Sequence, residues 1–145
     1  MNFSGTYLSD DVKFLLKKIE ISSTDITNKE KLIQSGQSHY SEMITFEKAP
    51  TEKYKAIFKK SLSQYEKRFS QDVINLAHKI LDDYKNEKEI TLISLARAGT
   101  PIGVLLKRYL SFISAKKINH YCVSIIRDIG LDNNAIKFIL NKHSD

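Results

Sequence analysis

The sequence has little of three residue types that would mark a specialised class of protein. Among its 145 residues there are one cysteine, two prolines and five glycines. The single cysteine, Cys122, excludes an internal disulfide and a multi-cysteine metal site, as expected in a reducing compartment. The scarcity of proline and glycine, without any repetitive tract, argues against a disordered or fibrous chain. The chain is therefore expected to fold as one domain or as part of one.

Long apolar runs are also missing. No run approaches the roughly 18 to 20 residues that are needed to span a bilayer. The N-terminus, with Asp10 and Asp11 soon after Met1, lacks the basic-then-apolar order of a secretory signal. These absences predict a cytoplasmic protein without membrane association.

Basic residues outnumber acidic ones, with 23 Lys and Arg against 17 Asp and Glu, which gives a net charge of +6. Such a surplus favours an anionic partner, which would be a phosphorylated small molecule, a nucleic acid or an acidic protein. However, the basic residues alternate with acidic ones along predicted helices, and no RRM, KH or zinc-finger pattern is present. A solvated face explains this better than a nucleic-acid footprint.

The first half of the chain, residues 1–86, has helical periodicity. Apolar residues at helical spacing follow Ser9, which predicts a short helix capped by that residue. Thr27 and Glu30 form a capping box, and the helix behind them should end near Gly36. From Thr51 onward the pattern predicts one long helix, or two helices with a break at Ser70.

The second half, residues 87–145, has a different pattern. The run 89–95 (EITLISL) is typical of a buried strand, and 120–126 (HYCVSII) of a second one. A helix with Thr100 as its cap and Pro101 in its first turn lies between them, and Asp132 should cap a last helix. This βαβα order predicts an α/β fold with a parallel sheet and right-handed crossovers. Because two strands cannot bury both faces of such a sheet, the chain is expected to lack the C-terminal rest of a larger domain.

The turn between the first strand and its helix, residues 96–103, is the candidate binding site. Ligands of open parallel sheets bind at the carboxyl ends of strands, where the next helix offers free N–H groups. Gly99 would let a phosphate approach the backbone, the Thr100 hydroxyl could donate to it, and Arg97 could supply charge. The alternative is that Gly99 and Gly103 only allow close packing of strand and helix. The turn is neither GxGxxG nor a P-loop, which disfavours dinucleotides and nucleoside triphosphates held in those ways.

Four segments of the sequence carry a family resemblance. They are FSGTYLSDDVKFLLK, KEKLIQSGQSHYSEM, SLARAGTPIGVLLKRYL and HYCVSIIRDIGLD. In this order, they resemble the phosphoribosyltransferase-like proteins of bacterial tellurite-resistance and stress-response gene clusters, a family also named StiP cysteine proteases. The resemblance covers nearly the whole chain.

The resemblance implies a type I phosphoribosyltransferase fold, in which Arg97, Ala98, Gly99 and Thr100 form the pyrophosphate loop. It implies phosphoribosyl pyrophosphate or a nucleotide-like molecule as ligand, with a divalent metal such as Mg²⁺ as a companion. The family continues into an acidic loop for the ribose 5-phosphate, and this chain ends at Asp145 without it. We therefore expect a single, C-terminally truncated domain with impaired catalysis. Expected binding partners are a second copy of the chain or proteins of the same stress-response gene cluster.

Two alternatives remain open at this point. The chain could be a non-catalytic phosphate- or nucleotide-binding partner subunit, or a thiol protease. A protease would need Cys122 activated by a histidine, and His120 would share a face with it on an extended strand, with His39 as a second candidate. A buried strand cysteine is more often inert packing. Arg127 and Asp128 follow the second strand, where they could contact substrate or only pair with each other.

Overall fold

The computed structural model describes residues 3–20, 25–37, 43–44, 48–126 and 130–143. The chain divides into two compact units, which are described one at a time. The sheet unit comprises residues 1–16 and 65–145, and the helical unit comprises residues 17–64. The prediction of one truncated domain, helical over 1–86 and βαβα over 87–145, stays a prediction.

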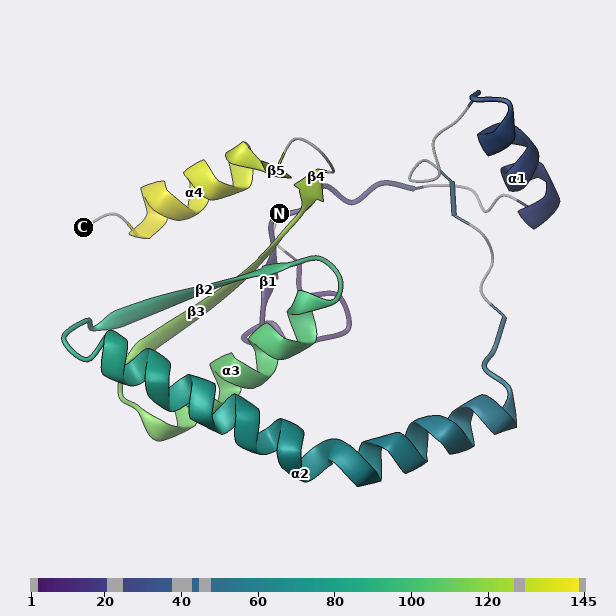
Figure 1. Ribbon diagram of the computed structural model, residues 1–145. Coiled ribbons are helices and arrows are strands. Elements are labelled where there is room, and N and C mark those ends of the chain that lie inside the picture. The colour runs from purple at the N-terminus through teal and green to yellow at the C-terminus, as the bar shows by residue number, and fades with distance from the viewer. Residues whose placement is uncertain (1–2, 21–24, 38–42, 45–47, 127–129, 144–145) are drawn as a thin grey trace. The chain divides into compact units, whose positions relative to one another are not determined.

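A small parallel sheet forms the centre of the sheet unit (Figure 1). Strands β2 (Glu89–Leu95) and β3 (Lys117–Val123) pair in parallel over seven residues each. Strand β1 (Lys13–Phe14) adds to the other side of β3, so the strand order is β1-β3-β2. The predicted strand at 89–95 and the predicted parallel pairing are confirmed.

Strand β1 replaces the helix that was predicted behind Ser9. Phe14 donates its N–H to the Phe3 carbonyl at 2.8 Å, and Leu15 donates to the Cys122 carbonyl at 2.9 Å. Val12 becomes buried, with 1% of its surface exposed. The helical prediction was wrong because pairing with β3 satisfies this backbone and buries Val12, and such tertiary contacts override a weak local preference.

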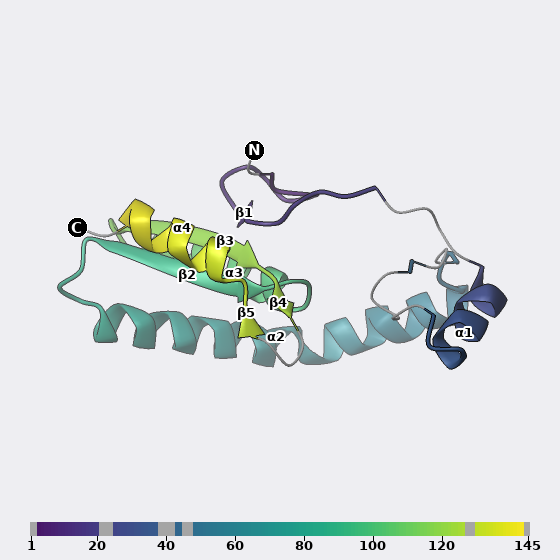
Figure 2. The same cartoon turned by 90° about the horizontal axis from the view of Figure 1, so that it is seen from above.

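Helices cover the two faces of the sheet unequally. Helix α3 (Gly99–Ile113) and the second half of α2 (Glu52–Asp83) pack on one face, where they enclose Ile90 and Ile118. Helix α4 (Asn133–His143) packs on the other face, against Tyr121 and Val123 of β3, and the view from above in Figure 2 shows it in front of the strands. Side chains alternate along β3, so even-numbered residues face α3 and odd-numbered residues face α4.

The end of the second strand differs from its prediction. Strand β3 begins at Lys117, three residues earlier than expected, and ends at Val123. The next residues form β4 (Ile125–Ile126), which pairs antiparallel with β5 (Gly130–Leu131). The predicted cap of the last helix is confirmed, because Asp132 accepts from the N–H of Asn134 at 2.9 Å and from that of Ala135 at 3.3 Å.

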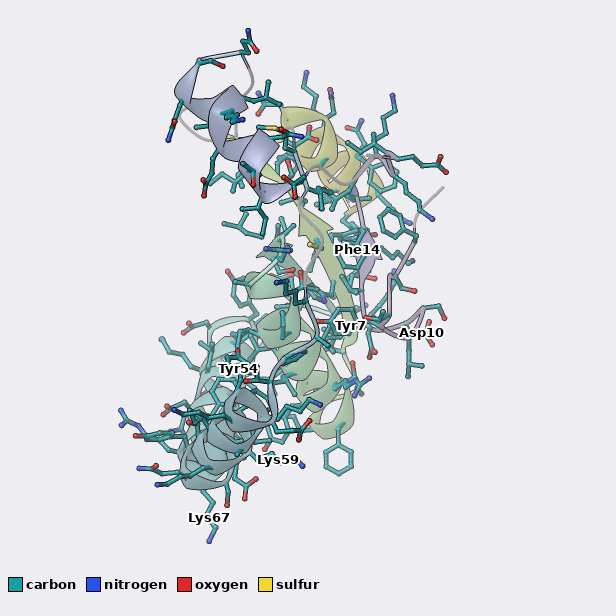
Figure 3. All side chains as sticks on the ribbon, turned by 90° about the vertical axis from the view of Figure 1, so that its right-hand side faces the viewer. Tyr7, Asp10, Phe14, Tyr54, Lys59 and Lys67 are labelled. Atoms are coloured by element: carbon teal, nitrogen blue, oxygen red, sulfur yellow. The ribbon has the colours of Figure 1, made fainter. Side chains whose placement is uncertain are left out.

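Helix α2 is one continuous helix of 32 residues without a break at Ser70. The Thr51 hydroxyl accepts from the N–H of Tyr54 at 3.2 Å and so caps its first turn. Figure 3 labels Tyr54, Lys59 and Lys67 along this helix, and all three are exposed. Only Ala77 is buried among its residues, so the packed part of α2 lies in the sheet unit.

The helical unit contains α1 (Ile26–Gln34) and the first half of α2. The cap of α1 is Asp25, which accepts from the N–H of Thr27 at 3.0 Å, so the predicted cap was two residues too late. The predicted end near Gly36 is confirmed, since Gly36 has φ of 69°, a conformation that glycine adopts without strain. Within the described residues, no helix combines the length and the hydropathy of a membrane span.

Candidate functional site

The turn from β2 into α3 lies at the carboxyl end of the parallel strands. Ala96 donates its N–H to the Val123 carbonyl at 2.9 Å, which extends the pairing of β2 with β3 by one residue. The peptide bond between Ala96 and Arg97 is cis. The N–H of Thr100 then reaches the Arg97 carbonyl at 3.2 Å, and α3 starts at Gly99.

The start of α3 carries no side-chain cap. Its N-cap is Ala98, and no side chain hydrogen-bonds there. The prediction that Thr100 caps this helix was wrong, because Thr100 lies inside the first turn and is only 2% exposed. First-turn N–H groups without a side-chain partner are donors for an anion, and the helix dipole adds to their effect.

A hollow of about 600 Å³ lies beside this turn. Its walls are β2 from Leu92, the turn through Gly99, and Ile102, Gly103 and Leu106 of α3, with Ile125 at one side. Arg97 and Ala98 are exposed at its rim. The hollow therefore combines an apolar wall with an exposed guanidinium and backbone donors.

The two glycines of this region have different roles. A Cβ built at Gly103 would lie 2.2 Å from Nε2 of His120, so this glycine is required for α3 to approach β3. A Cβ at Gly99 would only reach ordinary contact, 3.6 Å from Cβ of Ser94. The packing explanation therefore accounts for Gly103 and leaves Gly99 without a structural reason.

Buried polar side chains lie between the turn and the sheet. The Thr100 hydroxyl and the Cys122 thiol are 3.1 Å apart. His120 donates from Nδ1 to the Asp11 carbonyl at 2.9 Å, and its Nε2 is 2.8 Å from the Ser94 hydroxyl. Since a carbonyl only accepts, Nδ1 carries the proton and the Ser94 hydroxyl donates to Nε2. The Thr100 hydroxyl is thus turned towards the protein interior.

The arrangement of Cys122 and His120 does not match an activated thiol. The two side chains face α3 from the same side of β3, as their spacing predicts, and they are 0% and 2% exposed. Both ring nitrogens of His120 are occupied by Asp11 and Ser94. Burial lowers the pKa of His120, so its imidazole is neutral near pH 7. A thiol nucleophile needs access to substrate and a base within reach, and this geometry provides neither.

Three of the candidate residues lie outside the described residues. They are His39, which lies between α1 and α2 in the sequence, and Arg127 and Asp128, which lie between β4 and β5 in the sequence. Their predicted roles stay predictions. Among the residues that the structure does describe, no group of three or more His, Cys, Asp or Glu side chains could hold a metal ion.

An ion pair that the sequence did not suggest fixes the N-terminal segment. Arg108 of α3 binds the Asp11 carboxylate through Nε at 2.7 Å and through Nη2 at 2.6 Å. This hydrogen bonding holds the pKa of Asp11 below its usual value. The same segment contains Tyr7 and Phe14, which pack against Val12, Val104 and Cys122 and are labelled in Figure 3. No local sequence signal links Asp11 to a partner 97 residues away.

A second unpredicted cluster lies at the amino ends of β2 and β3. Nε2 of His143 is 2.9 Å from the Tyr121 hydroxyl, and Nδ1 of His143 is 2.5 Å from the Glu89 carboxylate. Glu89 also binds Lys117 at 2.8 Å, and this contact lowers the pKa of the carboxyl. The cluster connects the end of α4 to the sheet.

Comparison with known proteins gives a family. The family described as "Tellurite-like stress resistance cysteine protease StiP" matches residues 5–145. A protein named "Cysteine protease StiP" from Acinetobacter baylyi is 42% identical over 141 residues, which is 97% of this chain. The chain spans 36% of the length of that relative. No solved structure matches, so the resemblance to a phosphoribosyltransferase fold stays a prediction.

Proposed function

The chain belongs to the StiP family of tellurite-like stress resistance proteins, and from that premise we propose that it binds a phosphate-bearing ligand through residues 96–100. The observation that carries the proposal is the uncapped start of α3 at the carboxyl end of β2, beside a hollow of about 600 Å³. Pyrophosphate, alone or within phosphoribosyl pyrophosphate, is the proposed ligand class. Mg²⁺ would enter together with it.

The groups that would bind the ligand are few. The N–H groups at the start of α3 would donate to phosphate oxygens, and Arg97 would add a charged hydrogen bond. Gly99 would leave room for a phosphate oxygen against the backbone. Ligand binding would thus explain the glycine at this position, which packing does not explain. The Thr100 hydroxyl would keep its partner Cys122 and the Thr100 N–H its partner, the Arg97 carbonyl, so Thr100 would contribute neither group to the ligand.

Calorimetric titration with pyrophosphate and with phosphoribosyl pyrophosphate, each with and without Mg²⁺, tests the proposal. We expect Arg97→Ala to weaken binding about tenfold or more, since a charged hydrogen bond is worth about 1.5–3 kcal/mol. Gly99→Val should also weaken it, because the side chain would occupy the approach to the backbone. Arg68→Ala is the matched control, since Arg68 is an exposed arginine of α2. Equal affinity of wild type and Arg97→Ala would reject the proposal.

The name of the family favours a second candidate function, cysteine proteolysis. In this chain, the nucleophile would have to be Cys122, the only cysteine. That role requires the thiol to leave Thr100, become accessible and gain a base, because His120 is engaged with Asp11 and Ser94.

Iodoacetamide labelling followed by mass spectrometry measures whether the Cys122 thiol is accessible in the folded chain. Fast labelling of Cys122 in the folded chain, together with loss of proteolysis of a fluorescent casein in Cys122→Ser, would support the protease. Labelling only after unfolding would show that Cys122 is a core residue. A protease nucleophile would then have to come from the part of the longer relative that this chain does not span.

A further inference from the structure

Strand β2 is an edge strand that is paired on one side only. All seven of its residues pair with β3, and β1 adds on the far side of β3. Within the part of the chain that the structure describes, no strand pairs with the outer edge of β2. The outer edge therefore presents a row of unpaired backbone groups as long as β2 itself.

Two hydrogen bonds show which backbone groups point outwards. Ala96 donates to Val123 of β3, and Lys88 accepts from Lys117 of β3. Backbone groups alternate in direction along a strand, so even-numbered residues of β2 bond to β3. The N–H and C=O groups of Thr91, Ile93 and Leu95 consequently point to the free edge.

The same residues carry uncovered apolar side chains. Ile93 is 48% exposed and Leu95 is 39% exposed, on the face of the sheet opposite α3. Helix α4 lies on that face but packs against Tyr121 and Val123 of β3. Parallel sheets are normally buried on both faces, and no described residue covers this half of the sheet.

The free edge lies between two hollows. The hollow of about 600 Å³ is bounded on the α3 side by Leu92, Ile102 and Leu106, and it also reaches Ile93 and Leu95 of the edge. A second hollow, of about 920 Å³, on the α4 side is bounded by Thr91 and Ile93 of β2 and by Ile139 and Leu140 of α4. The edge is thus flanked by empty space on both faces of the sheet.

Beyond Glu89 at its first residue, the strand has none of the usual protections against edge pairing. Its sequence, EITLISL, contains no proline and no lysine, and it runs without a bulge in register with β3. Proteins normally protect a long apolar edge with such features or cover it with another segment. The outer edge of β2 therefore resembles an edge that another segment covers.

We propose that the outer edge of β2 accepts a further β-strand, supplied by the part of a StiP-family protein that lies outside the region matched by this chain. The Acinetobacter baylyi relative has such a part, because the chain spans only 36% of it. The added strand would bond to Thr91, Ile93 and Leu95, and the segments attached to it would fill the two hollows.

A second copy of the chain is a poorer occupant. Two β2 strands could pair across a two-fold axis, but each copy would bring the same two unfilled hollows. Such pairing would satisfy the backbone and leave Ile93 and Leu95 without a cover. A segment with its own apolar side chains and helices meets both needs.

Coexpression of this chain with the remaining part of the Acinetobacter baylyi protein tests the proposal. We expect a one-to-one complex in analytical ultracentrifugation. In hydrogen exchange, the amides of Thr91, Ile93 and Leu95 should slow by about tenfold or more in the complex. The amides of Ile90, Leu92 and Ser94 are the internal control, since they already bond to β3.

Two variants at one position separate pairing from folding. Ile93→Pro removes an outward donor without touching a bond to β3, and Ile93→Lys places a charge on the uncovered face. Both should abolish the complex, whereas Leu76→Lys, at a similarly exposed position of α2, should not. If the proline variant fails to fold, the lysine variant still decides.

Three results would overturn the proposal. The first is the absence of a complex, and the second is a complex that leaves the amides of β2 unprotected. The third is self-association of the chain alone, if Ile93→Lys abolishes it. This result would show that a second copy pairs with the outer edge of β2. The intact relative provides an independent measurement, because its strand aligned with Glu89–Leu95 must then exchange as slowly as a central strand.

Discussion

Gly103 is the residue at which α3 comes closest to the sheet. The ring of His120 below it is fixed at both nitrogens, so it cannot move aside for a Cβ that would lie 2.2 Å away. We expect Gly103→Ala to lower the free energy of unfolding by about 3 kcal/mol, the upper end of the usual cost of overpacking. Urea unfolding followed by circular dichroism measures it.

Gly99→Ala is the matched control for that substitution. The added Cβ would meet Ser94 at 3.6 Å, an ordinary contact, and the backbone of Gly99 is helical. Its free energy of unfolding should stay close to that of the wild type. Equal losses for the two variants would contradict the close approach at Gly103.

His120 should make the free energy of unfolding depend on pH at values above those at which Asp11 and Glu89 titrate. Burial lowers its folded pKa below the value of 6.5 for an unfolded histidine. Between these two values the unfolded chain binds more protons, so the free energy of unfolding decreases as the pH falls below about 6.5. Asp11 and Glu89, whose pKa values are also lowered, lose their contribution only as the pH falls through and below their unfolded values of 3.8 and 4.5.

Urea midpoints measured between pH 7.5 and 5 check this dependence. His120→Gln is less stable at pH 7.5 but should have a flatter profile over that range, because it cannot take up a proton. Parallel profiles of the variant and the wild type would assign the dependence to other groups.

The residues of the candidate site could be located from sequence more readily than their contacts. The strand end, Gly99 and the shared face of His120 and Cys122 follow from spacing along strand and helix. The direction of the Thr100 hydroxyl does not, because it is set by Cys122, 22 residues away. The pair of Asp11 and Arg108 depends on a contact across 97 residues, for which local patterns hold no information.

At the scale of elements, Asp132 lies between β5 and α4 and caps the first turn of the helix. Asp132 accepts from two N–H groups there, and its side chain is an acceptor in the place where the dipole favours negative charge. We expect Asp132→Ala to cost about 1 kcal/mol in the free energy of unfolding and to speed exchange of the first α4 amides.

Asp132→Asn separates capping from charge. It keeps the acceptor oxygen and should cost only a few tenths of a kcal/mol. Unfolding of the two variants in urea, with hydrogen exchange of α4, provides the comparison. A loss for the asparagine variant as large as that for the alanine variant would show that the charge, and not the hydrogen bonds, holds this helix.

The elements with strong local signals were predicted, and those that depend on distant pairing were not. Strand β2, helix α3 and the cap of α4 have apolar periodicity and turn chemistry in their own sequences. Strand β1 is only two residues long and forms because it pairs with β3. Its own sequence carries no strand signal and resembles the start of a helix. The β4–β5 pair is equally short.

At the scale of the whole molecule, buried surface is distributed very unevenly between the two units. Met43 is the one buried hydrophobic residue of the helical unit among the described residues, and α1 buries none. The sheet unit holds all three core clusters, and each of them includes a residue of β3. Because opening free energy follows buried contacts, the helical unit should open at a much lower cost than the sheet unit.

Limited trypsin digestion resolved by mass spectrometry measures this difference. We expect cleavage first at Lys53 and Lys55, in the half of α2 that buries no residue, and late cleavage at Lys107 and Lys116. Lys107 and Lys116 flank the packed end of α3 and bond to the carbonyls of Asp10 and Glu87, so their cleavage requires opening of the sheet unit. Early cleavage at Lys107 would mean that β3 does not hold its three clusters together. In that case the edge of β2 would be only one of several uncovered surfaces, and a strand added there would have to order the whole sheet unit as it binds.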